Sequence, residues 1–106
     1  SDTDRIFEIV EEMPSFPGGQ QALLEYLKDN VQYPPTEACV QGRVIVSFVV
    51  EKDGSITNVK TVRSVDTAFD REAERVVKAM PKWMPGKQNG ILVRTRYNVP
   101  VTFRLQ

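Results

Sequence analysis

Apolar and polar residues alternate over the last part of the chain, from Val93 to Gln106. Because successive side chains of a β-strand point to opposite faces of the sheet, this pattern predicts one long strand with a buried face and a wet, cationic face. Pro100 lies inside this segment. Proline has no N–H to donate, so it favours an edge strand with that side of the backbone facing outward. An open edge is a place where another chain can add a strand.

An earlier segment, Val44 to Val50, also alternates, but Ile45 and Val49 make its second face apolar too. A strand that is apolar on both faces belongs in the middle of a sheet. Asp53-Gly54 follows, and because both residue types tolerate the positive φ of a tight hairpin turn, Ile56 to Val65 is predicted to return antiparallel. The apolar residues of this returning strand do not alternate strictly, so we expect a β-bulge or an early end to the pairing.

Two other segments have the spacing of amphipathic helices. The first runs from Gly19 to Asn30 and is stopped by Tyr33-Pro34-Pro35, after which a short helical turn is expected through residues 36–38. The second begins at a cap on Asp66 or Thr67 and ends at a proline. The apolar residues of the second helix are Phe69, Ala73, Val76, Val77 and Met80.

The elements follow one another as strand, strand, helix and strand, with a helix ahead of them. A hairpin places the first two strands side by side, and a right-handed crossover carries the last strand to the far side of the first. The sequence therefore predicts an α+β domain: a ββαβ core with a three-stranded antiparallel sheet, order 2-1-3, helices on one face and the Val93 strand at an edge. We expect residues 1–14 to form an N-terminal extension, with a short strand within Arg5–Glu11, and residues 15–106 to form the domain.

Composition narrows the function classes. Acidic and basic residues number 14 each, without a run of either sign, so nothing marks the chain as a partner for nucleic acid or an anionic membrane. The single cysteine, Cys39, and the absence of histidine remove an internal disulfide and the commonest metal and acid–base groups. No cofactor or metal site is expected. The chain begins at Ser1, and we expect a processed or cloned fragment whose upstream segment is not included.

Catalysis has little support in the sequence. Four carboxylates gather around the start of the second helix, and paired carboxylates can do acid–base work, but acidic residues there also favour the helix dipole. We therefore expect a structural role for Asp66, Asp70, Glu72 and Glu74. Gly18-Gly19 precedes a helix without the Lys-Ser/Thr of a phosphate loop. Trp83 is expected to be a core plug that closes one end of the sheet.

Several short motifs share an order and spacing. They are Tyr33-Pro34, Gln41-Gly42-Arg43-Val44, Lys52-Asp53-Gly54-Ser55, the Asp70 to Met80 helix and Trp83-Met84-Pro85-Gly86-Lys87. Together they resemble the C-terminal domain of the energy transducer TonB, over the range from Asn30 to Leu105. The Phe16-Pro17-Gly18-Gly19 helix entry looks like an extension found in TonB-like proteins of the Bacteroidetes kind.

This resemblance implies a periplasmic module tethered upstream to the inner membrane. Such a module pulls on outer-membrane transporters with proton-motive force delivered by ExbB and ExbD. It also implies that the transporter's TonB box pairs with the last strand, and that the segment before the Tyr-Pro motif meets the receptor. The partner-binding residues implied in this way are Asn30, Val31, Gln32, Tyr33, Val93, Arg94, Thr95, Arg96, Tyr97, Asn98, Val99, Val101 and Phe103.

Three alternatives stay open at this point. The chain is a TonB-like sensory or interaction domain of another membrane protein, such as an antibiotic-sensing metallopeptidase, or it is an enzyme built on the carboxylate cluster. In the third alternative the edge strand serves self-association, by pairing with its twin in a homodimer or with the Ile6 to Val10 segment. Arginines on the outer face of the last strand are expected to favour an acidic peptide.

Overall fold

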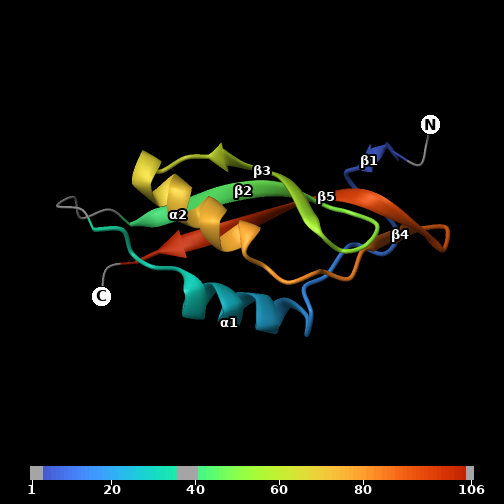
Figure 1. The fold of residues 1–106 in the computed structure, drawn as a ribbon, viewed down its shortest axis with the longest axis horizontal. Coiled ribbons are helices and arrows are strands. Elements are labelled where there is room, and N and C mark those ends of the chain that lie inside the picture. Colours follow the sequence, from blue (N-terminus) through green and yellow to red (C-terminus); the bar gives the residue numbers. More distant parts are fainter. Residues whose placement is uncertain (1–3, 36–40, 105–106) are drawn as a thin grey trace.

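A computed structural model describes residues 4–35 and 41–104. Its elements in chain order are β1 (Ile6–Phe7), α1 (Gln20–Asn30), β2 (Gly42–Val50), β3 (Ile56–Arg63), α2 (Thr67–Lys78), β4 (Gly86–Gln88) and β5 (Ile91–Phe103). Figure 1 shows both helices beside the long central strands, with α1 alongside the C-terminal half of β5 and β1 near the start of β5. The expected turn at 36–38, and Cys39, lie outside the described residues.

The sheet has five strands in the order β1-β5-β2-β3, with β4 paired to β5 off this path. β2 is antiparallel to both β3 and β5, whereas β1 is parallel to β5. The predicted number of strands and the purely antiparallel pairing are therefore wrong, whereas β2 does lie between β3 and β5 and is antiparallel to both. The prediction omitted β4, because a strand of three residues carries almost no periodicity. It expected a short strand within Arg5–Glu11 but did not count it in the sheet, where β1 pairs with β5.

The core lies between the helices and one face of the sheet. β2 presents Val44, Val46, Phe48 and Val50 to it, all fully buried, and Val49 on the opposite face is fully buried as well. A strand buried on both faces has to be flanked by other strands, and β2 lies between β3 and β5. The side chains that complete this core from the helices and loops include Phe16, Leu23, Leu27, Phe69, Ala73, Val76, Val77, Met80 and Trp83.

The two helices lie where the spacing predicts them. Asp66 caps α2 by accepting a hydrogen bond from the backbone N–H of Ala68 at 3.1 Å, whereas α1 has no side-chain cap at Gly19. The hydroxyl of Tyr26 on α1 donates to the carbonyl of Val76 on α2, at 2.8 Å. This bond joins the helices directly, so both contribute to one core.

Turns and irregularities define how the strands pair. The predicted β2–β3 hairpin is present, but its turn differs from the prediction. Gly54 has a positive φ of 90°, whereas Asp53 does not have a positive φ. The loop is closed by hydrogen bonds between Glu51 and Ser55 and between Gly54 and Glu51, each 2.8 Å. Of the bulge or early end expected here, the structure shows irregular pairing: the β2–β3 register shifts between Ile45 and Val46 and again between Ser47 and Val49. Asn58, on β3 at the second shift, has a φ of 52°.

Trp83 closes one end of the sheet, as expected for a core plug. Only 3% of the residue is exposed. Its ring contacts Phe16, Phe48 and Tyr97 with centroid distances of 5.8, 5.2 and 5.0 Å, all close to edge-on. These edge-to-face contacts are the favourable geometry for aromatic rings, so Trp83 ties the N-terminal segment to the sheet.

The N-terminal residues also pack on the sheet. Glu12 forms an antiparallel bridge with Lys87, and Ser15 forms one with Met84. Of the predicted strand within Arg5–Glu11, only Ile6 and Phe7 adopt strand geometry, and they pair with β5. This N-terminal pairing is one of the alternatives that the sequence left open for the last strand.

Candidate functional site

The two sides of β5 differ in what they pair with. One side pairs with β2 along its length, from Gly42 opposite Phe103 to Val50 opposite Thr95. β1 pairs with Arg94 and Thr95 on the other side. Over residues 96–103, no strand within the described part of the chain pairs with this second side. We call this stretch the free edge. The expectation that β5 is an edge strand over its whole length is wrong at Arg94 and Thr95, where β1 pairs with it.

Several side chains of β5 are buried, so the main chain is the part of this strand that a partner can bind. Val99, Val101 and Phe103 are at most 2% exposed, and Thr95 is fully buried. An incoming peptide therefore cannot contact Thr95, Val99 or Val101 from outside, whereas the backbone groups on the free edge can accept another strand. Of the candidate residues on β5, Asn98 is exposed and Tyr97 is half-buried against Phe48 and Trp83.

A groove of about 490 Å³ opens beside the C-terminal half of the free edge. The residues lining it come from α1, the segment after it and the end of β5: Leu24, Leu27, Lys28, Val31, Tyr33, Pro100, Thr102, Phe103 and Arg104. Leu24 is 53% exposed, so the groove has an accessible apolar wall. Among the described residues of the lining, Lys28 and Arg104 are the charged ones, and both carry positive charge.

The segment Asn30–Tyr33 is divided between two surroundings. Val31 and Tyr33 line the groove, and the Tyr33 ring packs edge-on against Phe69 at 5.1 Å. The backbones of Asn30 and Gln32 instead bond to α2, through Arg75 and Glu72 at 3.1 and 2.7 Å. The structure therefore brings part of the predicted receptor-facing segment next to the end of β5.

Glu72 fixes the path of the chain between the two helices. The Arg75 guanidinium, with both Nε and Nη2 bonded to this carboxylate at 2.7 and 2.8 Å, lowers the pKa of Glu72 below its ordinary value. The N–H of Gln32 lowers it further. Glu72 is therefore charged at neutral pH and acts as a clamp on the segment that follows α1.

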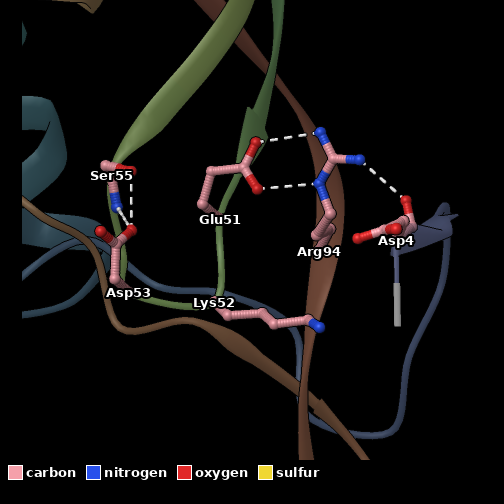
Figure 2. A pocket seen from close by; sticks show the side chains of 6 residues that line it. All are labelled: Asp4, Glu51, Lys52, Asp53, Ser55 and Arg94. Atoms are coloured by element: carbon pink, nitrogen blue, oxygen red, sulfur yellow. Dashed lines mark hydrogen bonds and ion pairs between the residues drawn. The ribbon is translucent and has the colours of Figure 1, made fainter.

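A second, polar pocket lies at the β2–β3 turn and contains a network of charges (Figure 2). Glu51 accepts two hydrogen bonds from Arg94, at 2.8 and 3.1 Å, and this pairing lowers the pKa of Glu51. Asp53 accepts hydrogen bonds from the backbone and hydroxyl of Ser55. Both carboxylates hold local structure, and no group of three potential metal ligands occurs in residues 4–35 and 41–104.

The carboxylates around α2 also have structural partners. Asp66 caps the helix, and Asp70 accepts from the Ser64 hydroxyl and from the Val65 N–H. Glu74 accepts from the backbone and hydroxyl of Thr61, at 3.1 and 2.6 Å. None of them lines either of the two pockets described above. The clustering of carboxylates around α2, which was the only support for an acid–base site, is therefore explained by helix capping and by contacts between α2 and the neighbouring chain.

Sequence reasoning missed Leu24 and Lys28 as site residues. The signal was present, since Leu24 lies beside the stripe of Leu23, Tyr26 and Leu27 and widens the apolar face of α1. It also missed the β4–β5 hairpin, whose turn Asn89-Gly90 has φ values of 54° and 77°. Asn-Gly with positive φ at both positions is the strongest short hairpin signal.

The fold and this site together define a class. An α+β domain whose accessible features are an unpaired strand edge and an adjoining apolar groove has the arrangement used to bind extended peptides, in which main-chain pairing provides affinity and a groove selects side chains. The chain belongs to the family described as the Gram-negative bacterial TonB protein C-terminal domain, whose profile matches residues 29–105. None of the helices in the described residues has the length and hydropathy needed to span a membrane.

A solved structure supports the same fold. The solution structure of the TonB C-terminal domain of Helicobacter pylori is similar to this chain with a TM-score of 0.58 and 21% sequence identity. The similarity covers 85% of this chain and 87% of the Helicobacter domain. No curated protein sequence matches the chain.

Proposed function

We propose that this domain is the periplasmic C-terminal part of a TonB-like energy transducer and binds the TonB box of outer-membrane transporters by strand addition. In this proposal an upstream segment anchors the domain in the inner membrane, and ExbB and ExbD supply the energy. Family membership over residues 29–105 supports the transducer role. The helix entry at Phe16-Pro17-Gly18-Gly19 motivates placing it among TonB-like proteins of the Bacteroidetes kind.

The observation that carries the proposal is the free edge at residues 96–103 beside the groove. A strand that pairs with this edge extends the sheet, so alternate side chains of the added strand point to the face on which the core and α1 lie. Those side chains reach the groove walls formed by Leu24, Val31 and Tyr33. Lys28 and Arg104 favour an acidic residue in the same peptide.

The test is a titration of the isotope-labelled chain with a synthetic TonB-box peptide from a TonB-dependent transporter. We expect backbone amide shifts along residues 96–103 and in α1 around Leu24. Shifts absent from both places would contradict the proposal.

A matched pair of variants separates the groove from general surface effects. Leu24→Gln removes an apolar wall while keeping a good helix former, and we expect it to weaken peptide binding about fivefold, or about 1 kcal/mol. Leu92→Gln makes the same change at a leucine that is 40% exposed and lies outside the groove. Equal weakening by both variants would show that the groove has no special part in binding.

A further inference from the structure

The chain already places one of its own strands next to the edge that the proposed function uses, on the same side of β5. β1 runs parallel to β5, with Ile6 opposite Arg94 and Phe7 opposite Thr95. It lies on the side of β5 that faces away from β2, which is also the side of the free edge. β1 therefore stands at the end of the free edge, where an added strand longer than residues 96–103 would have to continue.

The arginines of β5 hold this N-terminal segment. Arg94 donates from Nη1 to the carbonyl oxygen of Asp4 at 2.8 Å while two of its other nitrogens bond to Glu51, as Figure 2 shows. The Arg96 guanidinium pairs with the carboxylate of Glu8 at 3.2 Å. Glu51, at the end of β2, holds the Arg94 side chain in place. Arg94 can therefore donate a hydrogen bond to a carbonyl oxygen of β1 or of another strand in the same position.

The same segment is weakly attached to the rest of the molecule. Within Asp4–Glu8 no side chain is buried, and Ile6 and Phe7 are only half-buried. From Asp4 onward the first buried residue is Val10, and the bridges of Glu12 and Ser15 hold the chain beyond it. Asp4–Glu8 can therefore leave β5 without opening the core, as expected of a local unit of low stability.

We propose that Asp4–Glu8 competes with partner peptides for β5. A partner strand that extends from the free edge past Arg96 to Thr95 and Arg94 displaces this segment. Displacement frees the guanidinium of Arg96 for a carboxylate and one nitrogen of Arg94 for a carbonyl of the partner. This inference rests on the proposed function, because it names what regulates access to the same edge. It also predicts the partner's chemistry at this end: an extended strand with an acidic residue next to Arg96.

Two changes to the chain test the competition. A variant lacking residues 1–8 and the full chain are titrated with the same TonB-box peptide. If β1 is docked about nine-tenths of the time, the shortened variant binds about tenfold more tightly, because the apparent affinity of the full chain is reduced by the fraction of open edge. Equal or weaker binding by the shortened variant overturns the proposal while leaving strand addition at residues 96–103 intact.

Point variants in the full chain give a matched comparison. Glu8→Gln removes the ion pair with Arg96, and we expect it to tighten peptide binding severalfold. Glu12→Gln makes the same change of charge four residues further along, outside Asp4–Glu8. Arg96 pairs with Glu8, and the bridge of Glu12 to Lys87 uses only the backbone. Equal effects of the two variants would show that net charge, and not β1 docking, controls affinity.

A probe taken from the chain itself does not depend on any transporter. A synthetic peptide of residues 1–11 is added to the labelled variant that lacks residues 1–8. Amide shifts at Arg94, Thr95 and Arg96 that restore the full-chain positions support a displaceable strand, and their absence overturns it. If the TonB-box peptide binds neither the full chain nor the shortened variant, the proposed function fails. The experiment with the peptide of residues 1–11 then decides by itself whether β1 is displaceable.

Discussion

The two halves of β5 share one alternating pattern but have different surroundings. The first half, residues 91–95, pairs with β4 and with β1. The second half, residues 96–103, pairs only with β2 among the described strands and borders the groove beside α1. A single strand thus combines a part that is closed by its own chain with a part that remains available to another chain.

The difference separates side-chain burial from backbone availability. The second half contributes three inward-facing side chains that are at most 2% exposed, Val99, Val101 and Phe103, whereas Ile91 at the start of the strand is 66% exposed. Yet the second half has the free edge, with which no described strand pairs. The part of β5 most important for stability is therefore also the part best placed for binding.

The largest expected effect comes from truncating the end of the second half. Phe103 packs edge-on against Phe69 with a centroid distance of 4.9 Å. We expect Phe103→Ala to lower the free energy of unfolding by about 3–5 kcal/mol in a denaturant titration, because it leaves a cavity in the core. Ile91→Ala is the control and should stay within about 0.5 kcal/mol. Similar losses in both variants would remove the contrast between the two halves.

An intermediate effect is expected where β4 lies against the first half. A Cβ added at Gly86 would lie 2.4 Å from the Thr95 hydroxyl oxygen and 3.3 Å from the Glu12 carbonyl oxygen. We therefore expect Gly86→Ala to destabilise the fold by about 1–3 kcal/mol and to speed amide exchange at Glu12. Lys87→Ala, at an exposed position of the same strand, should change stability by less than about 0.5 kcal/mol. Unchanged exchange at Glu12 would argue against close packing there.

The smallest expected effect concerns pH and the ion pair at the first half. The hydrogen bonds from Arg94 lower the folded-state pKa of Glu51 below its ordinary value of 4.5. The stability from this pair is therefore fully present above about pH 4.5 and is lost as the pH falls through the folded-state pKa. Denaturant midpoints should show Glu51→Gln less stable than the natural chain at neutral pH, with a difference that shrinks in acid. A constant difference would contradict this assignment.

Much of the fold was predictable because it depends on local patterns. Alternation identified β2 and β5, and helical spacing identified α1 and α2. A cap was expected at Asp66 or Thr67, and Asp66 provides it through its bond to Ala68. The irregular spacing after Ile56 predicted a bulge or an early end to the pairing, and the β2–β3 register does shift. The site was less predictable, because Leu24 and Phe103 lie far apart in the sequence and become neighbours only when α1 packs beside β5.

The sequence by itself determined which face of β5 is buried, since apolar side chains on alternate positions can be removed from water only on one side of a sheet. Only the tertiary structure decided which strands pair along its second side. Backbone hydrogen bonds are the same for every residue type except proline, so the sequence of β5 does not encode whether β1 ends at Phe7 or continues. The length of the free edge follows from where the N-terminal chain turns away from β5.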